Sequence, residues 1–193
     1  MTGGLLIKVC GITRASDAEA CQAMGVDFCG FVFHPQSPRN VSAKDVAQIH
    51  TGQLRRVGVF TTHDTDAILR AMDMAQLDYA QLHANQSEAC AEAIGAERVI
   101  RVCFALPSSA QCAAFLLFDK PFDWHDLHER SVCQPFFVAG GLNPRNICEA
   151  LTCASPTGVD LNSGVESAPG QKDASRIREV LDRIATIKNR MER

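Results

Sequence analysis

The sequence predicts an α/β protein, a single-domain (β/α)8 TIM barrel that spans residues 1–193. Its 193 residues, of which 46% are hydrophobic and 21% charged, fit one domain with a core of its own. Eight short apolar runs alternate along the chain with segments of helical spacing. No run of antiparallel hairpin signals interrupts this alternation, and consecutive βα units without hairpins favour a closed parallel barrel.

The eight predicted strands are short runs rich in β-branched and aromatic residues. Runs that stay apolar at consecutive positions suit strands that are buried on both faces of a parallel sheet. They occupy residues 5–10, 27–33, 56–60, 78–83, 99–104, 115–119, 135–139 and 158–161.

Six helices are predicted between and after these strands from apolar residues three or four positions apart. Ser42 is a candidate N-cap, because a side-chain oxygen there can accept a free N–H of the first turn. The helices occupy residues 17–24, 42–49, 64–75, 87–94, 143–151 and 173–187.

The fifth and sixth units have weak helical signals, at residues 107–114 and 124–130. An open doubly wound sheet is therefore the alternative architecture. Such sheets often carry a Gly-x-Gly-x-x-Gly turn after the first strand, whereas Gly11 stands alone there. The pattern thus favours the barrel and argues against a dinucleotide cofactor.

Charge and hydropathy exclude several classes of protein. The net charge is −3 with a pI near 6.0, and no basic stripe suggests a nucleic-acid partner. The longest apolar runs, residues 115–118 and 135–139, are far too short to span a bilayer. The first residues lack the basic region and cleavage site of a signal peptide, so we expect no membrane association.

The nine cysteines predict reduced thiols in a cytoplasmic protein. Their number is odd and no Cys-x-x-Cys pair occurs, which argues against a disulfide framework and a zinc ribbon. His125 and His128 lie three residues apart without a third ligand, so we predict no metal site.

The candidate active site lies where the strands end, because barrel enzymes place catalysis at the carboxyl ends of their strands. Cys10 closes the first strand and Asp119 the sixth, on opposite sides of the barrel mouth. A thiolate and a carboxylic acid facing each other could act as general base and general acid. The alternatives are a buried core cysteine and a strand-end carboxylate paired with Lys120.

Two glycine-containing turns predict a phosphate site. Gly140 and Gly141 follow the seventh strand, and Ser163 and Gly164 follow the eighth. Barrels commonly bind phosphate at these two positions through backbone N–H groups. Arg39, in a rigid turn after Pro38, offers a planar fork for an anionic substrate. His83 ends the fourth strand and is either a ligand or a half-buried structural histidine.

Several segments, in order along the chain, strongly resemble phosphoribosylanthranilate isomerases. The resemblance runs from Ile7 to Ile184. It is carried by Lys8 to Thr13 with Asp17 and Ala18, Gly30 to Phe33, Ser37 to Ser42, Val57 to Phe60, Gln81 to His83, Ala139 to Pro144, Gly158 to Glu166 and Pro169 to Asp173.

The resemblance implies a cofactor-free barrel enzyme of tryptophan biosynthesis. Its reaction is the Amadori rearrangement of N-(5-phosphoribosyl)anthranilate to a 1-deoxyribulose 5-phosphate. Cys10 matches the general base and Asp119 the general acid, while Arg39 matches the contact to the anthranilate end. The remaining matches are Gln81, His83 and Asp160 as substrate-binding residues and Gly140, Gly141, Ser163 and Gly164 as phosphate-binding residues.

One departure from the family concerns a glycine-rich loop that folds over the substrate. Here Asp119 is followed by Lys120 and Pro121 and then directly by the matching Phe122-Asp123-Trp124. Either the protein lacks this lid or the 193 residues omit it, and the close succession of two matching motifs favours omission. A true loss predicts a collapse of turnover with phosphate binding retained.

That departure supports a second hypothesis, a non-catalytic phosphosugar-binding barrel. A bisubstrate isomerase that accepts a substrate with two phosphates is disfavoured, because no second glycine pair occurs in the first half. The expected partner is a small phosphorylated amino-sugar, and the chain is expected to be a monomer or a homodimer.

Overall fold

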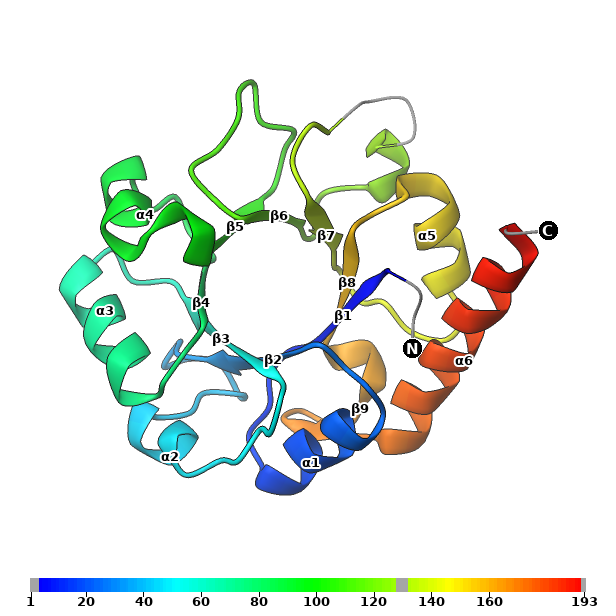
Figure 1. The fold of residues 1–193 in the computed structure, drawn as a ribbon, viewed down its shortest axis with the longest axis horizontal. Coiled ribbons are helices and arrows are strands. Elements are labelled where there is room, and N and C mark those ends of the chain that lie inside the picture. The colour runs from blue at the N-terminus through cyan, green and yellow to red at the C-terminus, as the bar shows by residue number, and fades with distance from the viewer. Residues whose placement is uncertain (1–3, 128–131, 192–193) are drawn as a thin grey trace.

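The structure, a computed structural model, describes residues 4–127 and 132–191 and contains a closed barrel of eight strands (Figure 1). Neighbouring strands follow one another in sequence order, all pairs are parallel, and β8 pairs with β1. This closure confirms the predicted barrel and excludes the open doubly wound sheet.

The eight barrel strands coincide with the eight predicted runs, and no end differs by more than one residue. Their bounds are β1 Leu6–Val9, β2 Phe28–Val32, β3 Arg55–Phe60, β4 Tyr79–Leu82, β5 Val99–Cys103, β6 Phe115–Phe118, β7 Phe136–Val138 and β8 Gly158–Leu161. The barrel closes in register, with Lys8 of β1 opposite Asp160 of β8.

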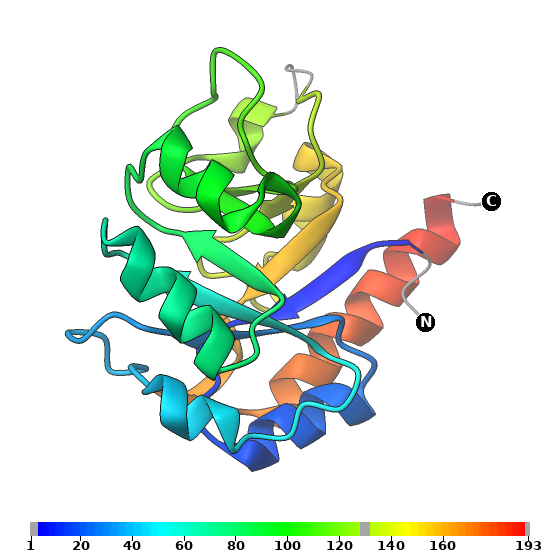
Figure 2. The ribbon, with the colours of Figure 1, turned by 60° about the vertical axis from the view of Figure 1, so that its left-hand side comes forward.

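Within the described residues, six α-helices surround the strands at the six predicted places, although α5 begins and ends three or four residues later than predicted. They are α1 Ala15–Ala23, α2 Ala43–Ala47, α3 Thr65–Met74, α4 Glu88–Ile94, α5 Ile147–Ala154 and α6 Ala174–Met191. Ser42 accepts a hydrogen bond from the backbone N–H of Asp45, which confirms it as the N-cap of α2. The longest helix, α6, packs outside the barrel against α5 (Figure 1) and against α1 (Figure 2).

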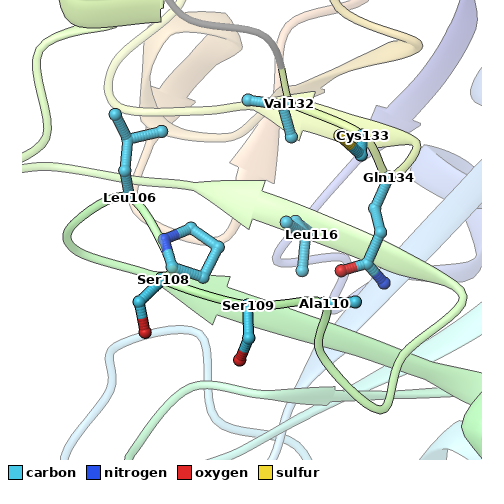
Figure 3. Close-up of a pocket in the computed structure, with 9 residues that line it drawn as sticks. Leu106, Ser108, Ser109, Ala110, Leu116, Val132, Cys133 and Gln134 are labelled. Atoms are coloured by element: carbon cyan, nitrogen blue, oxygen red, sulfur yellow. The ribbon is translucent and has the colours of Figure 1, made fainter.

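The ring of helices is incomplete beside β5, β6 and β7, where the sequence signals are weak. The connection from β5 to β6 is a loop without a helix (Figure 1), and a 3-10 turn, η2 Trp124–Leu127, follows β6. A hollow of about 340 Å³ lies in this sector, and Figure 3 shows Leu106, Leu116 and Val132 around it. The outer face of β6 is therefore covered by loops rather than by a long helix.

Two large hydrophobic cores form because successive strand residues point to opposite faces, and a small third cluster lies around Cys10. The larger core lies between the strands and the helices and includes Ile7 and Val9. The smaller core fills the barrel interior, where the ring of Phe28 packs edge-on against Phe137 with 5.6 Å between centroids. This apolar plug closes the lower barrel, so polar inward-facing side chains gather only at the carboxyl ends of the strands.

Short elements that the sequence analysis did not predict complete the fold. A 3-10 turn, η1 Ala96–Arg98, precedes β5, and a second, η3 Ser163–Val165, follows β8. An antiparallel pair, β9 Glu166–Ala168 and β10 Gln171–Lys172, comes before α6. Within the described residues, none of the helices has the length and apolar character needed to cross a membrane.

Candidate active site

A cavity of about 330 Å³ opens at the carboxyl ends of the barrel strands. It brings together every predicted site residue except Gly164, from β1, β4, β6, β7, β8 and the loop after β2. Those that line it are Cys10, Arg39, Gln81, His83, Asp119, Gly140, Gly141, Asp160 and Ser163.

Strand periodicity explains why these side chains point into the barrel. On β1, Leu6 packs at the interior core, and Lys8 and Cys10 follow at intervals of two. On β4, Gln81 and His83 follow Tyr79 in the same way. The first residue of each series lies deepest, and Cys10, Gln81 and His83 line the cavity.

Cys10 is buried at the cavity wall beside Val32 and Val59. Gly30 makes room for it, since a Cβ at that position would lie 2.8 Å from Cys10 Sγ and 3.2 Å from Lys8 Nζ. Burial raises the pKa of the Cys10 thiol, and the Lys8 ammonium acts in the opposite direction. The thiol is therefore protonated at rest, but a cation lies beside it to stabilise the thiolate.

Lys8 is the first functional candidate that the sequence analysis did not assign. Its side chain is fully buried, and Nζ donates a hydrogen bond to Asp160 Oδ2 at 2.8 Å. Burial opposes its charge, but the Asp160 carboxylate outweighs this effect and raises the pKa of Lys8. Its place two residues before Cys10 on the same strand face is the signal that could have found it.

Asp119 is half-buried and lines the cavity just beyond β6. Its Oδ1 accepts a hydrogen bond from the backbone N–H of Lys120 at 2.8 Å, while no ion pair joins the two side chains in the described structure. A Cβ on Gly140 would lie 3.6 Å from Oδ1, so the carboxyl group lies close to the first glycine turn.

Arg39 lies at the edge of the cavity in a charged network that includes two residues without an assigned role. Its Nε and Nη2 donate to the two carboxylate oxygens of Glu166 at 2.9 and 2.6 Å. Lys172 Nζ donates to the same carboxylate at 2.7 Å and to Asn162 Oδ1 at 3.0 Å. Burial opposes the ionisation of Glu166, but the hydrogen bonds from both cations prevail and lower its pKa to about 2.

Three buried polar atoms at the cavity have no hydrogen-bond partner within the described residues. They are Gln81 Oε1, His83 Nδ1 and Asp160 Oδ1. Burial lowers the pKa of His83, so its imidazole is neutral near pH 7. Buried polar groups normally have partners, and these atoms are therefore positioned to bind a polar ligand.

The two glycine turns pack against each other beside the cavity. Gly140 and Gly141 have φ angles of +95° and +79°, which favour glycine, and the carbonyl of Gly141 accepts from Asn143 Nδ2 at 2.9 Å. Gly164 does not line the cavity. A Cβ on it would lie 2.0 Å from the carbonyl oxygen of Leu142, so this glycine allows the two turns to approach.

The connection after β6 is short and closes as a tight turn. The backbone N–H of Phe122 donates to the carbonyl of Asp119 at 3.0 Å, and the Phe122 ring packs on Phe118 with 4.7 Å between centroids. Trp124 then begins η2. The chain thus passes directly from Asp119 to the next element without a glycine-rich loop.

No group of three or more His, Cys, Asp or Glu side chains suited to a metal ion occurs among the described residues. His125 contacts Asp123 and Glu149 instead, and His128 lies outside the described residues. All nine cysteines are described, and all are free thiols.

A parallel barrel with a polar cavity at the carboxyl ends of its strands defines a (β/α)8-barrel enzyme. The model of the N-(5'-phosphoribosyl)anthranilate isomerase family matches residues 7–183. The chain belongs to this family, which confirms the resemblance and the prediction of an isomerase.

Similar proteins cover nearly the whole chain. The N-(5'-phosphoribosyl)anthranilate isomerase of Desulfovibrio desulfuricans is 43% identical over 198 aligned positions, covering 92% of this chain and 94% of the relative. The alignment is longer than this chain, so the relative contains residues without a counterpart here. The crystal structure of phosphoribosyl anthranilate isomerase from Thermus thermophilus is 31% identical, with a TM-score of 0.81, covering 95% of this chain and 100% of that one.

A third similar structure is a phosphoribosyl anthranilate isomerase in complex with reduced 1-(o-carboxyphenylamino)-1-deoxyribulose 5-phosphate. It is 32% identical to this chain, with a TM-score of 0.81, and covers 94% of this chain and 99% of that one.

Proposed function

We propose that the chain converts N-(5'-phosphoribosyl)anthranilate to 1-(2-carboxyphenylamino)-1-deoxyribulose 5-phosphate by acid–base catalysis. The observation that carries this proposal is one cavity that contains both the buried thiol of Cys10 and the carboxyl group of Asp119. Membership of the isomerase family and the similar structure with a reduced product analogue support it.

Asp119 acts as the general acid. Its proton goes to the furanose ring oxygen while the bond from that oxygen to C1 breaks, and the nitrogen lone pair forms a C=N bond to C1. The product of this step is an open-chain iminium ion, which makes the neighbouring C2 proton acidic. The position of Asp119 at the cavity edge, beside Gly140, leaves the carboxyl group within reach of a bound sugar.

Cys10 acts as the general base. Its thiolate, formed when the resting thiol releases its proton to water, takes the C2 proton. The electrons of the C–H bond form a C1=C2 double bond, and the electrons of the C=N double bond return to nitrogen. The enolamine becomes the ketone when a proton is added at C1 and another leaves the C2 hydroxyl. The Lys8 ammonium and the Cys10 Sγ both lie against Gly30, and the positive charge of Lys8 favours the thiolate that this step requires.

The remaining cavity residues bind the substrate. The N–H groups of Gly140, Gly141 and Ser163, which make no hydrogen bond within the described residues, bind the phosphate. Gly164 lies behind them, where it allows the two turns to approach. Arg39, whose Nη1 makes no hydrogen bond within the described residues, contacts the anthranilate carboxylate. Gln81 and His83 supply polar atoms to the sugar, and Asp160 accepts from a hydroxyl group through Oδ1.

The test is a turnover assay with N-(5'-phosphoribosyl)anthranilate and chromatographic detection of the product. We expect activity from the wild type and its loss in both Cys10→Ala and Asp119→Asn. Removal of one acid–base group from a concerted site typically costs about 10²–10⁴ in rate. Full activity in either variant would contradict the assigned role.

A non-catalytic phosphosugar-binding barrel is the second candidate function, and the glycine-free turn from Asp119 to Phe122 favours it. The intact mass of the native protein distinguishes the two cases. A mass near 21.0 kDa would mean that the lid is absent, and ribose 5-phosphate binding without turnover would then support this candidate. A larger mass together with turnover would support the isomerase.

We further infer a single-domain protein, residues 1–193, that acts in the cytoplasm as a monomer or a homodimer. The free thiols support a reducing compartment. Burial raises the pKa of both Cys21 and Cys29 to about 12, so these core thiols are poorly reactive. Size-exclusion chromatography with light scattering tests the oligomeric state.

A further inference from the structure

Lys120 occupies an unusual position beside the first glycine turn. Its side chain crosses Gly140, where a Cβ would lie 2.9 Å from Lys120 Cγ. Its ammonium group ends at Gly141, where a Cβ would lie 3.5 Å from Lys120 Nζ. The two glycines therefore leave the space through which this side chain reaches the turn.

Lys120 differs from the buried and half-buried cations beside the cavity because, within the described residues, no carboxylate forms an ion pair with it. Lys8 is paired with Asp160, and both Arg39 and Lys172 are paired with Glu166. Lys120 is exposed, and its ammonium group makes no ion pair or hydrogen bond within the described residues. A positive charge is thus free at the turn where the proposed phosphate site lies.

The short connection after β6 fixes where this charge can reach. Lys120 follows Asp119 directly, and the turn closes two residues later through the hydrogen bond from Phe122 to the Asp119 carbonyl. The Lys120 backbone N–H is held by Asp119 Oδ1. The backbone at Lys120 is therefore anchored on both sides, and the side chain alone extends over Gly140 and Gly141.

We propose that the Lys120 ammonium group binds the phosphate of the substrate at the turn formed by Gly140 and Gly141, a role that rests on the proposed function. A phosphate monoester carries a charge of about −1.5 to −2 near pH 7 and accepts several hydrogen bonds. Lysine binds phosphate as a flexible point charge. The Lys120 side chain thus reaches from the short connection after β6 and contacts the phosphate directly.

The test compares Lys120→Met with Lys120→Arg and with a matched control, Lys44→Met. Lys44 is an exposed lysine on α2, outside the cavity. Ribose 5-phosphate is the probe, ribose is the unphosphorylated reference, and calorimetry or NMR titration gives the dissociation constant. These measurements need no turnover.

We expect Lys120→Met to weaken ribose 5-phosphate binding about tenfold, as the loss of one charge-assisted hydrogen bond does. Lys120→Arg retains most of the affinity, while Lys44→Met binds as the wild type does. Ribose binding is the same in all four proteins. In turnover, Lys120→Met raises KM by a similar factor with little change in kcat, because Asp119 keeps its backbone hydrogen bond.

Unchanged ribose 5-phosphate affinity in Lys120→Met would overturn the proposal, whether or not the protein turns over substrate. So would an equal loss of affinity in Lys44→Met, since the effect would then reflect net charge alone. Weakened binding in Lys120→Met from a protein without isomerase activity would support the role of Lys120 and contradict the proposed function. The binding measurements therefore test the role of Lys120, and the turnover assay separately tests the proposed function.

Discussion

At the scale of single residues, the site depends on how β1 places a buried thiol beside a buried ammonium group. Lys8 and Cys10 point inward from the same strand, and Gly30 on β2 leaves room for both, because a Cβ there would lie 2.8 Å from Cys10 Sγ and 3.2 Å from Lys8 Nζ. Burial raises the pKa of Cys10 more than Lys8 lowers it. The resting base is therefore protonated and becomes a strong base once its proton has left.

This balance predicts the pH dependence of Cys10 alkylation. A raised pKa means that the thiolate fraction, and with it the rate, grows about tenfold per pH unit from pH 7 to beyond the ordinary thiol value of 9.0. Iodoacetamide labelling with mass spectrometry of the Cys10 peptide measures it, and the exposed Cys133 reports the reagent's activity. A rate that levels off below pH 9.0 would show that Lys8 and Lys172 lower the pKa of Cys10 by more than burial raises it.

The buried ion pair between Lys8 and Asp160 predicts a stability effect. Lys8→Met leaves the Asp160 carboxylate without its cation, which costs about 3–5 kcal/mol of unfolding free energy. Lys8→Met/Asp160→Asn recovers much of this loss, because the uncompensated buried charge is then gone. Urea denaturation of the three proteins checks the prediction. A double variant as unstable as the single one would mean that packing, not charge, accounts for the loss.

At the scale of elements, Glu166 fixes the β9–β10 hairpin to the loop after β2 and to the cavity edge. Its carboxylate receives Arg39 from one side and Lys172 from the other, and the N–H of Gly170 completes its hydrogen bonds at 3.2 Å. One side chain thus holds the β9–β10 hairpin together and joins it to Arg39, 127 positions away in the sequence. Its ionisation should therefore contribute to stability.

The sign of this contribution follows from the depressed pKa of Glu166. The folded protein holds the carboxylate down to a pH of about 2, against an ordinary value of 4.5, so the stabilisation is present above pH 4.5 and lost as the pH falls through about 2. We expect Glu166→Gln to lower the unfolding free energy by about 2 kcal/mol at pH 7, allowing for solvent screening.

The difference between wild type and Glu166→Gln should shrink between pH 4.5 and about 2 and vanish below that range. Urea unfolding of both proteins across this range gives the measurement. A difference that stays constant with pH would show that the substitution acts through shape rather than charge.

The elements also show where sequence patterns suffice. The strand ending at Cys10 and the strand ending at Asp119 were predictable because apolar runs mark buried strands and barrel chemistry lies at their carboxyl ends. The β9–β10 pair was not predicted, since two or three residues carry too little periodicity. The Arg39–Glu166 pair joins residues 127 positions apart, and no local pattern encodes such a partner.

Within the site, a local sequence pattern predicts where Lys8 points but not where Lys120 points. Lys8 shares the strand face of Cys10, so the period of two indicates that both point inward. The direction of Lys120 depends on a turn whose conformation the sequence does not specify. Gly140 and Gly141 were predicted as phosphate ligands, but the space that they leave for a neighbouring lysine emerges only from the folded chain.

At the scale of the whole molecule, the barrel is unevenly covered. An α-helix follows each of β1 to β4, whereas a loop follows β5, a 3-10 turn follows β6, and a hollow of about 340 Å³ lies beside them (Figures 1 and 3). Local opening costs less where fewer apolar side chains cover a strand. The sector from β5 to β7 should therefore open more readily than the rest.

Two cysteines offer a matched test of this uneven stability. Cys29 on β2 and Cys103 on β5 are both buried in the outer core, with exposed fractions of 0% and 9%. We expect Cys103 to be labelled in native conditions through an opening that costs at least about 1 kcal/mol less than the opening that exposes Cys29.

Labelling rates across low urea concentrations, read by mass spectrometry, measure the free energies of both openings. A small urea dependence for Cys103 and a large one for Cys29 would identify local and global opening respectively, because the slope scales with the surface exposed. Equal slopes and equal free energies would mean that the barrel opens as one unit despite its incomplete ring of helices.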